Sequence, residues 1–279
     1  EDLGRTLSGE RDMTWPLDVS KARILISNDD GYYAPGLQVL VRMARSLTED
    51  VWVVAPETEQ SGAGHSLTLR RPLQAREHQP NWFSVNGTPA DCVLLAVNEL
   101  MKEKRPDIVL SGVNRHGNLA DDVTYSGTVS AAMEATILGV PAVAFSQELI
   151  EGQPADWTPA ETYGPNLLRR ILHEGFPPNT LLNVNFPPVP ADQVRGIQVT
   201  TQGRRKSGDD ILEVTDPRGS RHYWIGHMQS MKPYAEGTDL AAIDAGYISV
   251  TPIKMNMTDH ETLETLQDAF QLEKQPTES

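Results

Sequence analysis

The sequence has a single cysteine, Cys92, among its 279 residues. One cysteine excludes an internal disulfide framework and a zinc site built from CxxC pairs, and it is typical of a reducing compartment. Cys92 lies in the run DCVLLAV, which predicts the buried face of a helix rather than an exposed nucleophile. We therefore expect a cytoplasmic protein whose cysteine belongs to the core.

Long apolar runs are lacking as well. No stretch approaches the length needed to span a membrane, and residues 1–20 lack the apolar centre of a secretory signal. These residues are polar and include Gly and Ser, so we expect a flexible leader followed by a single domain over residues 21–279. The sequence predicts no membrane partner.

Basic residues are scarce relative to acidic ones. The chain has 24 Lys and Arg against 38 Asp and Glu, for a formal net charge of −14 at pH 7. A long nucleic acid needs a clustered basic surface, so we expect no such partner. A small phosphorylated ligand is compatible with this charge, because a bound metal ion can supply positive charge locally.

Four familiar catalytic signatures are absent. The sequence has no GxxxxGK[ST] loop, no GxGxxG at a helix start, no GxSxG elbow and no HExxH. These absences argue against a P-loop NTPase, a dinucleotide oxidoreductase, an α/β-hydrolase and a zinc protease.

The first half of the chain alternates short apolar runs with amphipathic segments. Strands are predicted at residues 22–27, 51–56, 83–87, 107–113 and 141–146, and helices at 35–47, 90–101 and 127–138. Strands that alternate with helices predict an α/β fold with a mainly parallel sheet covered on both faces. Ligands of such sheets bind at the carboxyl ends of the strands.

The pattern becomes less regular beyond about residue 150. We predict a helix near 167–173, strand-like pieces at 181–186, 196–202, 221–226 and 247–253, and an amphipathic helix at 259–270. Residues 201–233 are rich in charge and in turn formers. We interpret them as an excursion from the main sheet, a hairpin that contacts another subunit.

Polar residues follow the first two predicted strands. Asp29 and Asp30 end the first strand, where two adjacent carboxylates repel each other and lose hydration unless a cation neutralises them. An ordinary turn explains NDDG as well. In the small-residue loop SGAGHS, Ser61 is a candidate oxygen ligand and His65 is a candidate proton donor. A flexible turn with a solvated histidine is equally compatible with this sequence.

A third polar cluster follows the strand at 107–113. Its candidate residues are Asn114, Asn118, Asp121, Asp122, Ser126 and Thr128. Ser126 precedes a predicted helix, and a helix N-terminus presents unpaired N–H groups that suit a phosphate. Plain N-capping explains Ser126 and Thr128 equally well.

Seven fragments of the chain, taken in order, resemble the SurE family of survival-protein nucleotidases. They are NDDGYYAPGL, APETEQSGAGHSLT, VNGTPADCV, PDIVLSGVN, DVTYSGTVSAAMEA, LNVNFP and GTDLAAIDAGYISVTP, and they extend from about Arg23 to Pro252. The resemblance implies a Rossmann-like three-layer α/β/α sandwich. It also implies a protruding β-hairpin and a C-terminal segment that are exchanged in a homodimer or homotetramer.

The resemblance further implies the residues of the active site. A divalent cation would be held by Asp29, Asp30, Ser61 and Asn114, with Asp29 and Asp30 also catalytic. Ser126, Gly127 and Thr128 match the family's phosphate-binding SGT turn, and Asn118 falls in register as a further phosphate contact. His116 departs from the pattern, because the family usually has glycine at that position.

The implied reaction is hydrolysis of nucleoside 5′- and 3′-monophosphates, with short-chain polyphosphate as a further substrate in some members. An all-oxygen ligand set favours one Mg²⁺ or Mn²⁺ per subunit, with Ca²⁺ as the alternative. Two rival hypotheses are a phosphatase in which Asp29 is itself phosphorylated and a nucleotide-sensing protein without turnover. The adjacent aspartates argue against the first, since such enzymes usually separate their two aspartates by one residue.

Overall fold

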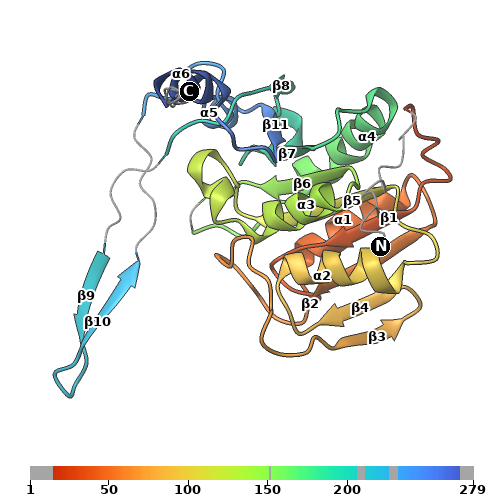
Figure 1. Cartoon of the computed structure of the whole chain (residues 1–279), viewed down its shortest axis with the longest axis horizontal. Coiled ribbons are helices and arrows are strands. Elements are labelled where there is room, and N and C mark those ends of the chain that lie inside the picture. Colours follow the sequence, from red (N-terminus) through yellow and green to blue (C-terminus); the bar gives the residue numbers. More distant parts are fainter. Residues whose placement is uncertain (1–14, 151, 206–210, 226–231, 271–279) are drawn as a thin grey trace, which may run out of the picture.

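The computed structural model describes residues 15–150, 152–205, 211–225 and 232–270 (Figure 1). A nine-stranded sheet in the order β3-β4-β2-β1-β5-β6-β7-β11-β8 forms its centre. The strands are β1 (Ile24–Ser27), β2 (Val51–Pro56), β3 (Ala75–Gln79), β4 (Trp82–Val85), β5 (Ile108–Arg115), β6 (Ala142–Gln147), β7 (Thr180–Phe186), β8 (Ile197–Val199) and β11 (Ile248–Lys254). The six strands from β4 to β7 are parallel, whereas β3 and β11 run antiparallel to their inner neighbours.

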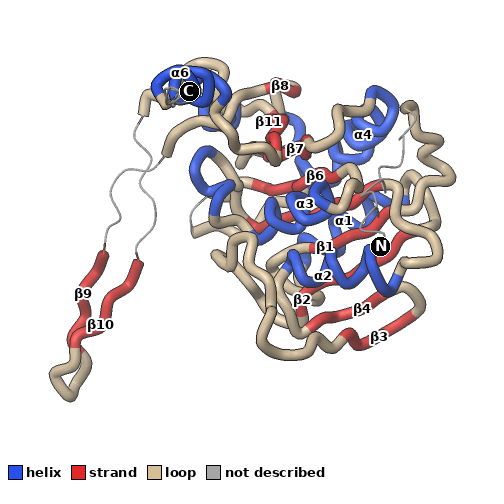
Figure 2. Tube along the Cα trace, viewed as in Figure 1, coloured by secondary structure: helices blue, strands red, loops and turns tan. Residues whose placement is uncertain are grey.

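Helices cover both faces of this sheet (Figure 2). The helices and helical turns are α1 (Pro35–Arg45), α2 (Pro89–Leu95), η1 (Ala96–Leu100), η2 (Ala120–Thr124), α3 (Gly127–Ile137), α4 (Thr158–Glu174), η3 (Ala191–Gln193), α5 (Asp239–Asp244) and α6 (His260–Ala269). Successive residues of a strand face opposite sides, so Ile24 and Ile26 pack with α1 and α4 while Leu25 packs with α2 and α3. The predicted three-layer α/β sandwich is confirmed.

The helix α3 is buried over most of its length, which explains its composition. Every residue from Gly127 to Thr136 is buried, and Ala131, Ala132 and Ala135 have no exposed surface. Small side chains let the helix lie close to the sheet on one side and to α2 on the other. The start of α3 is thereby held firmly at the carboxyl edge of the sheet.

Some predicted boundaries differ from those observed. The helix predicted at 90–101 is α-helical only to Leu95 and continues as the π-helical turn η1. The helix predicted near 167–173 is the last part of α4, whose earlier turns contain Gly164 and Pro165. Gly164 lies close to α1, since a Cβ at this position would lie 2.3 Å from the Met43 Cε atom and the Met43 side chain would have to move. The strand β3 was not predicted, because its polar sequence AREHQ is largely exposed.

A separate antiparallel hairpin, here called the arm, is formed by β9 (Ile211–Thr215) and β10 (Arg221–Ile225). Figure 1 shows the arm outside the body of the molecule. The predicted hairpin within residues 201–233 is therefore present. In the described part of the predicted leader, Trp15 contacts Phe176, and the Leu17 N–H donates to the Leu172 carbonyl at 3.0 Å; residues 1–14 lie outside the described residues.

The helix α6 presents its apolar residues to solvent. Leu263 and Leu266 are 39% and 44% exposed, and Phe270, which directly follows the helix, is 76% exposed. Across the described ranges, no helix combines the length and apolar character needed to cross a bilayer.

Candidate active site

The site lies where the order of the sheet reverses. From β1 the chain proceeds outward to β2 and β4, and from the adjacent β5 it proceeds the other way to β6 and β7. Such a reversal opens a crevice at the carboxyl ends of the two central strands, which is the usual ligand site of doubly wound sheets. Asp29 and Asp30 follow β1, and Asn114 lies near the end of β5. The fold thus brings together residues that are far apart in the sequence.

Asp30 is fixed directly to β5. Its Oδ2 accepts the Arg115 N–H at 3.1 Å, next to Asn114. The Asn114 Nδ2 donates to the His116 carbonyl at 2.8 Å, which leaves the amide oxygen as the group able to bind a cation. Burial raises the pKa of Asp30; the Arg115 N–H opposes this rise, and the charge of Glu59 adds to it.

Asp29 lies against the start of α3. It is 4% exposed, and this burial raises its pKa to about 6. The Thr128 hydroxyl donates to Asp29 Oδ1 and lowers the pKa, whereas the charge of Asp30 raises it. A Cβ at Gly127 would lie 2.7 Å from the Asp29 Cβ, so a residue without a side chain is required at this contact. Ser126 caps the helix by accepting the Val129 N–H at 3.0 Å. The SGT turn (Ser126–Thr128) and Asp29 therefore form one contiguous unit.

The loop that carries Ser61 connects these two parts. The Gln60 N–H donates to the Asp29 carbonyl at 2.8 Å, and the Gly64 N–H donates to the carbonyl of Tyr125 at 3.1 Å. Ser61 lies between these contacts; its side chain is exposed and donates to Glu59 Oε1 at 2.8 Å. The loop thus holds Gln60, the residue before Ser61, against Asp29, while the Ser61 hydroxyl is turned toward Glu59.

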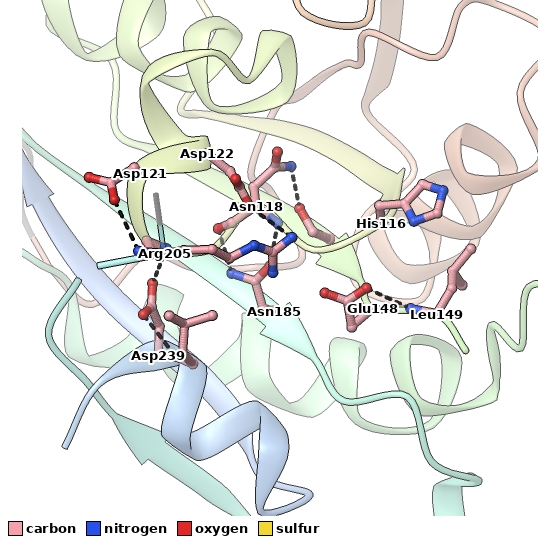
Figure 3. A network of polar contacts seen from close by, with 12 residues as sticks. His116, Asn118, Asp121, Asp122, Glu148, Leu149, Asn185, Arg205 and Asp239 are labelled. Carbon is pink, nitrogen blue, oxygen red and sulfur yellow. Dashed lines mark hydrogen bonds and ion pairs between the residues drawn. The ribbon is translucent and has the colours of Figure 1, made fainter. Parts of the chain in front are cut away.

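His65 and Asn118 are held by partners that the sequence did not indicate. The His65 Nε2 lies 2.8 Å from Oε2 of Glu134, a buried residue well inside α3. The Asn118 Nδ2 donates to the Ser146 Oγ at 2.7 Å, and its N–H donates to the Asn185 Oδ1 at 2.8 Å (Figure 3). Asn118 thus helps to fix the loop that leads to α3. The roles of these two residues toward phosphate stay predictions.

The residues present suit a hard divalent cation. Asp29 and Asp30 bring two neighbouring, largely buried carboxylates, and the raised pKa values of both show how unfavourable their charges are without a counter-ion. Asn114 and Ser61 add an amide oxygen and a hydroxyl. The part of the chain that the structure describes has no group of three or more His, Cys, Asp or Glu suited to a metal. A cation here would accordingly depend on Asn114 and Ser61 to complete its protein ligands.

Fold and site together define a doubly wound α/β protein with an oxygen-rich polar site at the switch point of its sheet. A family model described as survival protein SurE matches residues 24–209. The 5′-nucleotidase SurE of Paramagnetospirillum magneticum is 54% identical over 260 residues, which cover 92% of this chain and 100% of that protein. The chain belongs to the SurE family.

Two further comparisons agree with this assignment. The 5′-nucleotidase SurE of Rhodospirillum rubrum is 52% identical over 91% of this chain and 98% of its own length. The crystal structure of the SurE protein from Aquifex aeolicus superposes with a TM-score of 0.78 at 40% identity, covering 88% of this chain and 98% of that one. The resemblance inferred from seven short fragments is confirmed over nearly the whole chain.

Proposed function

We propose that this protein is a phosphatase that hydrolyses nucleoside monophosphates to nucleoside and phosphate. The printed names of its relatives, 5′-nucleotidase SurE, support this reaction. The observation that carries the proposal is the contact of buried Asp29 with the SGT turn at the N-terminus of α3. It supports the proposal because an acidic group lies against a helix N-terminus, and helix N-termini suit anions.

The start of α3 is the proposed phosphate site. N–H groups in the first turn of a helix have no intrahelical partner, and the positive end of the helix dipole favours an anion. Gly127 lets Asp29 lie against the start of the helix, Thr128 donates its hydroxyl to Asp29, and Ser126 flanks the turn on the other side. These groups would stabilise the charge that develops on the phosphoryl oxygens, and Asn118 holds the preceding loop in place.

A divalent cation, Mg²⁺ or Mn²⁺ with Ca²⁺ as the alternative, is proposed to be held by Asp29, Asp30, Ser61 and Asn114. When bound, it would supply positive charge to a phosphoryl oxygen and lower the pKa of a water ligand. Asp29, beside the proposed cation, is the first candidate to take up the proton of the attacking water. Asp30, held by the Arg115 N–H, is the second candidate for this role.

The proposed substrates are nucleoside 5′- and 3′-monophosphates and short-chain polyphosphate. The test is phosphate release from such a panel, with and without EDTA and with added Mg²⁺ or Mn²⁺, for the wild type and Asp30→Asn. We expect metal-dependent release that falls by at least about 100-fold in Asp30→Asn. Full activity after chelation would contradict the metal role, and tight nucleotide binding without release would indicate a nucleotide-sensing protein.

We also propose that the protein acts in the cytoplasm as a homodimer or homotetramer. The arm exposes a set of large apolar side chains: Ile211, Leu212, Val214, Tyr223, Trp224 and Ile225. The helix α6 adds Leu263 and Leu266, and the residue after it adds Phe270. Apolar groups gathered on a projecting hairpin and a terminal helix are typical of a surface that is covered by a second subunit.

A further inference from the structure

The 3₁₀ turn η2 leads directly into the SGT turn. The Asp122 carbonyl accepts the N–H of Tyr125 at 2.9 Å and the N–H of Ser126 at 3.0 Å. The backbone of Asp122 therefore helps to position the residues at which α3 begins. Anything that moves Asp122 moves the proposed phosphate site.

Residues 202–205, here called the base of the arm, hold η2 at three consecutive positions. The Gln202 Nε2 donates to the Ala120 carbonyl at 2.8 Å, and the Arg205 N–H donates to Asp121 Oδ2 at 3.0 Å. The Arg205 Nη2 lies 3.3 Å from Asp122 Oδ2. Figure 3 shows Arg205 extended along η2, with its guanidinium group beside Asp122.

Asp239 anchors the same residues independently of the Arg205 side chain. Its Oδ2 accepts the Ala120 N–H at 2.8 Å, and its Oδ1 accepts the Gly203 N–H at 2.8 Å. The path of the chain up to Arg205 is thus secured by backbone contacts. Replacing the Arg205 side chain removes its ion pair and leaves these anchors in place.

Asp122 is a carboxylate in an unfavourable position. It is 9% exposed, and its Oδ1 is buried and accepts no hydrogen bond from the described residues. Burial raises its pKa to about 6, the charge of Arg205 lowers that pKa, and the nearby charges of Glu148 and Asp239 raise it. The guanidinium of Arg205 is the counter-ion that opposes these effects.

We propose that Arg205 is a positioning residue for the active site: by pairing with Asp122 and bonding to Asp121, it fixes η2 and so holds the SGT turn in its phosphate-binding position. The base of the arm thereby becomes part of the site, although it lies about 80 residues further along the chain. The inference rests on the proposed function only in taking the SGT turn as the phosphate site.

The substitution Arg205→Gln tests this directly, and Arg204→Gln, at an exposed neighbour, is the matched control. We expect Arg205→Gln to weaken binding of inorganic phosphate by about tenfold in calorimetry, because a buried carboxylate loses its partner. KM for a nucleoside monophosphate should rise more than kcat falls. Arg204→Gln should leave both unchanged.

A second substitution, which removes the negative charge that Arg205 balances, separates positioning from a general loss of packing. Asp122→Asn removes the carboxylate that needs a counter-ion, so Arg205→Gln/Asp122→Asn should recover most of the phosphate affinity lost in Arg205→Gln. The double variant would be weaker than either single variant if the two side chains acted independently. That result would overturn the proposal.

The loss in Arg205→Gln should also depend on pH. Asp122 without its counter-ion takes up a proton more readily, so the loss of phosphate affinity should be larger at pH 8 than near pH 5.5. The other titratable groups facing Asp122 are Glu148, Asp239 and Asp121, and they are present in every variant. The pH dependence should therefore vanish in the double variant, and its persistence there would contradict the role of Asp122.

Hydrogen exchange gives a readout that does not require catalysis. The Tyr125 and Ser126 N–H groups bond to Asp122, so their exchange should be faster in Arg205→Gln than in the wild type or in Arg204→Gln. Unchanged exchange would overturn the proposal. A wild type that releases no phosphate would instead contradict the proposed function, while the exchange comparison would still decide the positioning role.

Discussion

The contact between Gly127 and Asp29 shows how a single residue can determine the geometry of the site. Asp29 comes at the end of β1, and Gly127 opens α3 almost 100 residues later. The hypothetical Cβ at Gly127 would meet both the Cβ of Asp29 and, at 3.1 Å, the Cγ of Pro89. Neither neighbour is the free end of a flexible side chain. The helix can therefore approach the carboxylate only because this residue is glycine.

The substitution Gly127→Ala should accordingly displace Asp29 from the SGT turn. Overpacking of this kind costs about 1–3 kcal/mol of stability, and a shift near 1 Å at a reacting group lowers activity by roughly 100-fold. We expect kcat/KM for nucleoside monophosphates to fall by that factor while the protein remains folded. Ile137→Ala, at an exposed position of the same helix, is the control. Unchanged kcat/KM in Gly127→Ala would show that the contact does not matter for turnover.

At the scale of elements, the arm is distinct from the body. Within the described residues, its two strands pair only with each other, in a separate two-stranded sheet. An isolated hairpin is marginally stable in water, and this one leaves large apolar side chains exposed on both strands. A second subunit that covers these side chains would stabilise the hairpin and the assembly together.

Replacing Trp224 and Ile225 with serine should therefore reduce the size of the assembly. These side chains are 67% and 86% exposed, and burial of each at an interface would contribute about 1.5–3 kcal/mol. Light scattering over a concentration series should show dissociation of the double variant at concentrations where the wild type is associated. Arg218→Ser, in the turn of the arm, is the control. A monomeric wild type would rule out the proposed assembly.

At the scale of the whole molecule, the buried carboxylate of Asp29 would link the proposed metal binding to stability and to pH. The folded protein raises the pKa of Asp29 to about 6 from an ordinary value of 3.8. The native state therefore binds more protons than the unfolded state between these values, so this group lowers stability as pH rises from about 4 to about 6. A cation that binds the charged form should offset this cost near neutral pH.

Added Mg²⁺ or Mn²⁺ should raise the Tm at pH 7 by roughly 5 °C when the ion is present at about 100 times its Kd. The shift should shrink at pH 5, because protonated Asp29 competes with the cation. Asp30→Asn should show a much smaller shift at both pH values. Thermal unfolding with and without EDTA measures these effects, and an equal shift in wild type and variant would exclude the proposed ligand set.

Much of the fold was predictable from local patterns. Apolar patterns in the sequence predict the helix α3 and four strands, β1, β2, β5 and β6. The strands are buried on both faces, which requires nearly continuous apolar runs. Edge elements were less predictable. The strand β3 carries little apolar signal, and the early turns of α4 contain Gly164 and Pro165, which tertiary packing tolerates although local propensity disfavours them.

The sequence by itself determined the polar clusters at the strand ends, the parallel sheet and the family, because these depend on residue type, order and spacing. Only the tertiary structure decided which distant groups meet: Gly127 against Asp29, His65 against Glu134, and Arg205 against Asp122. In the sequence, Glu134 looks like any other polar residue of a helix, and Arg205 looks like a surface charge in a turn-rich segment. Their partners lie 69 and 83 residues away, and such pairings arise from the packing of whole elements, which no local pattern records.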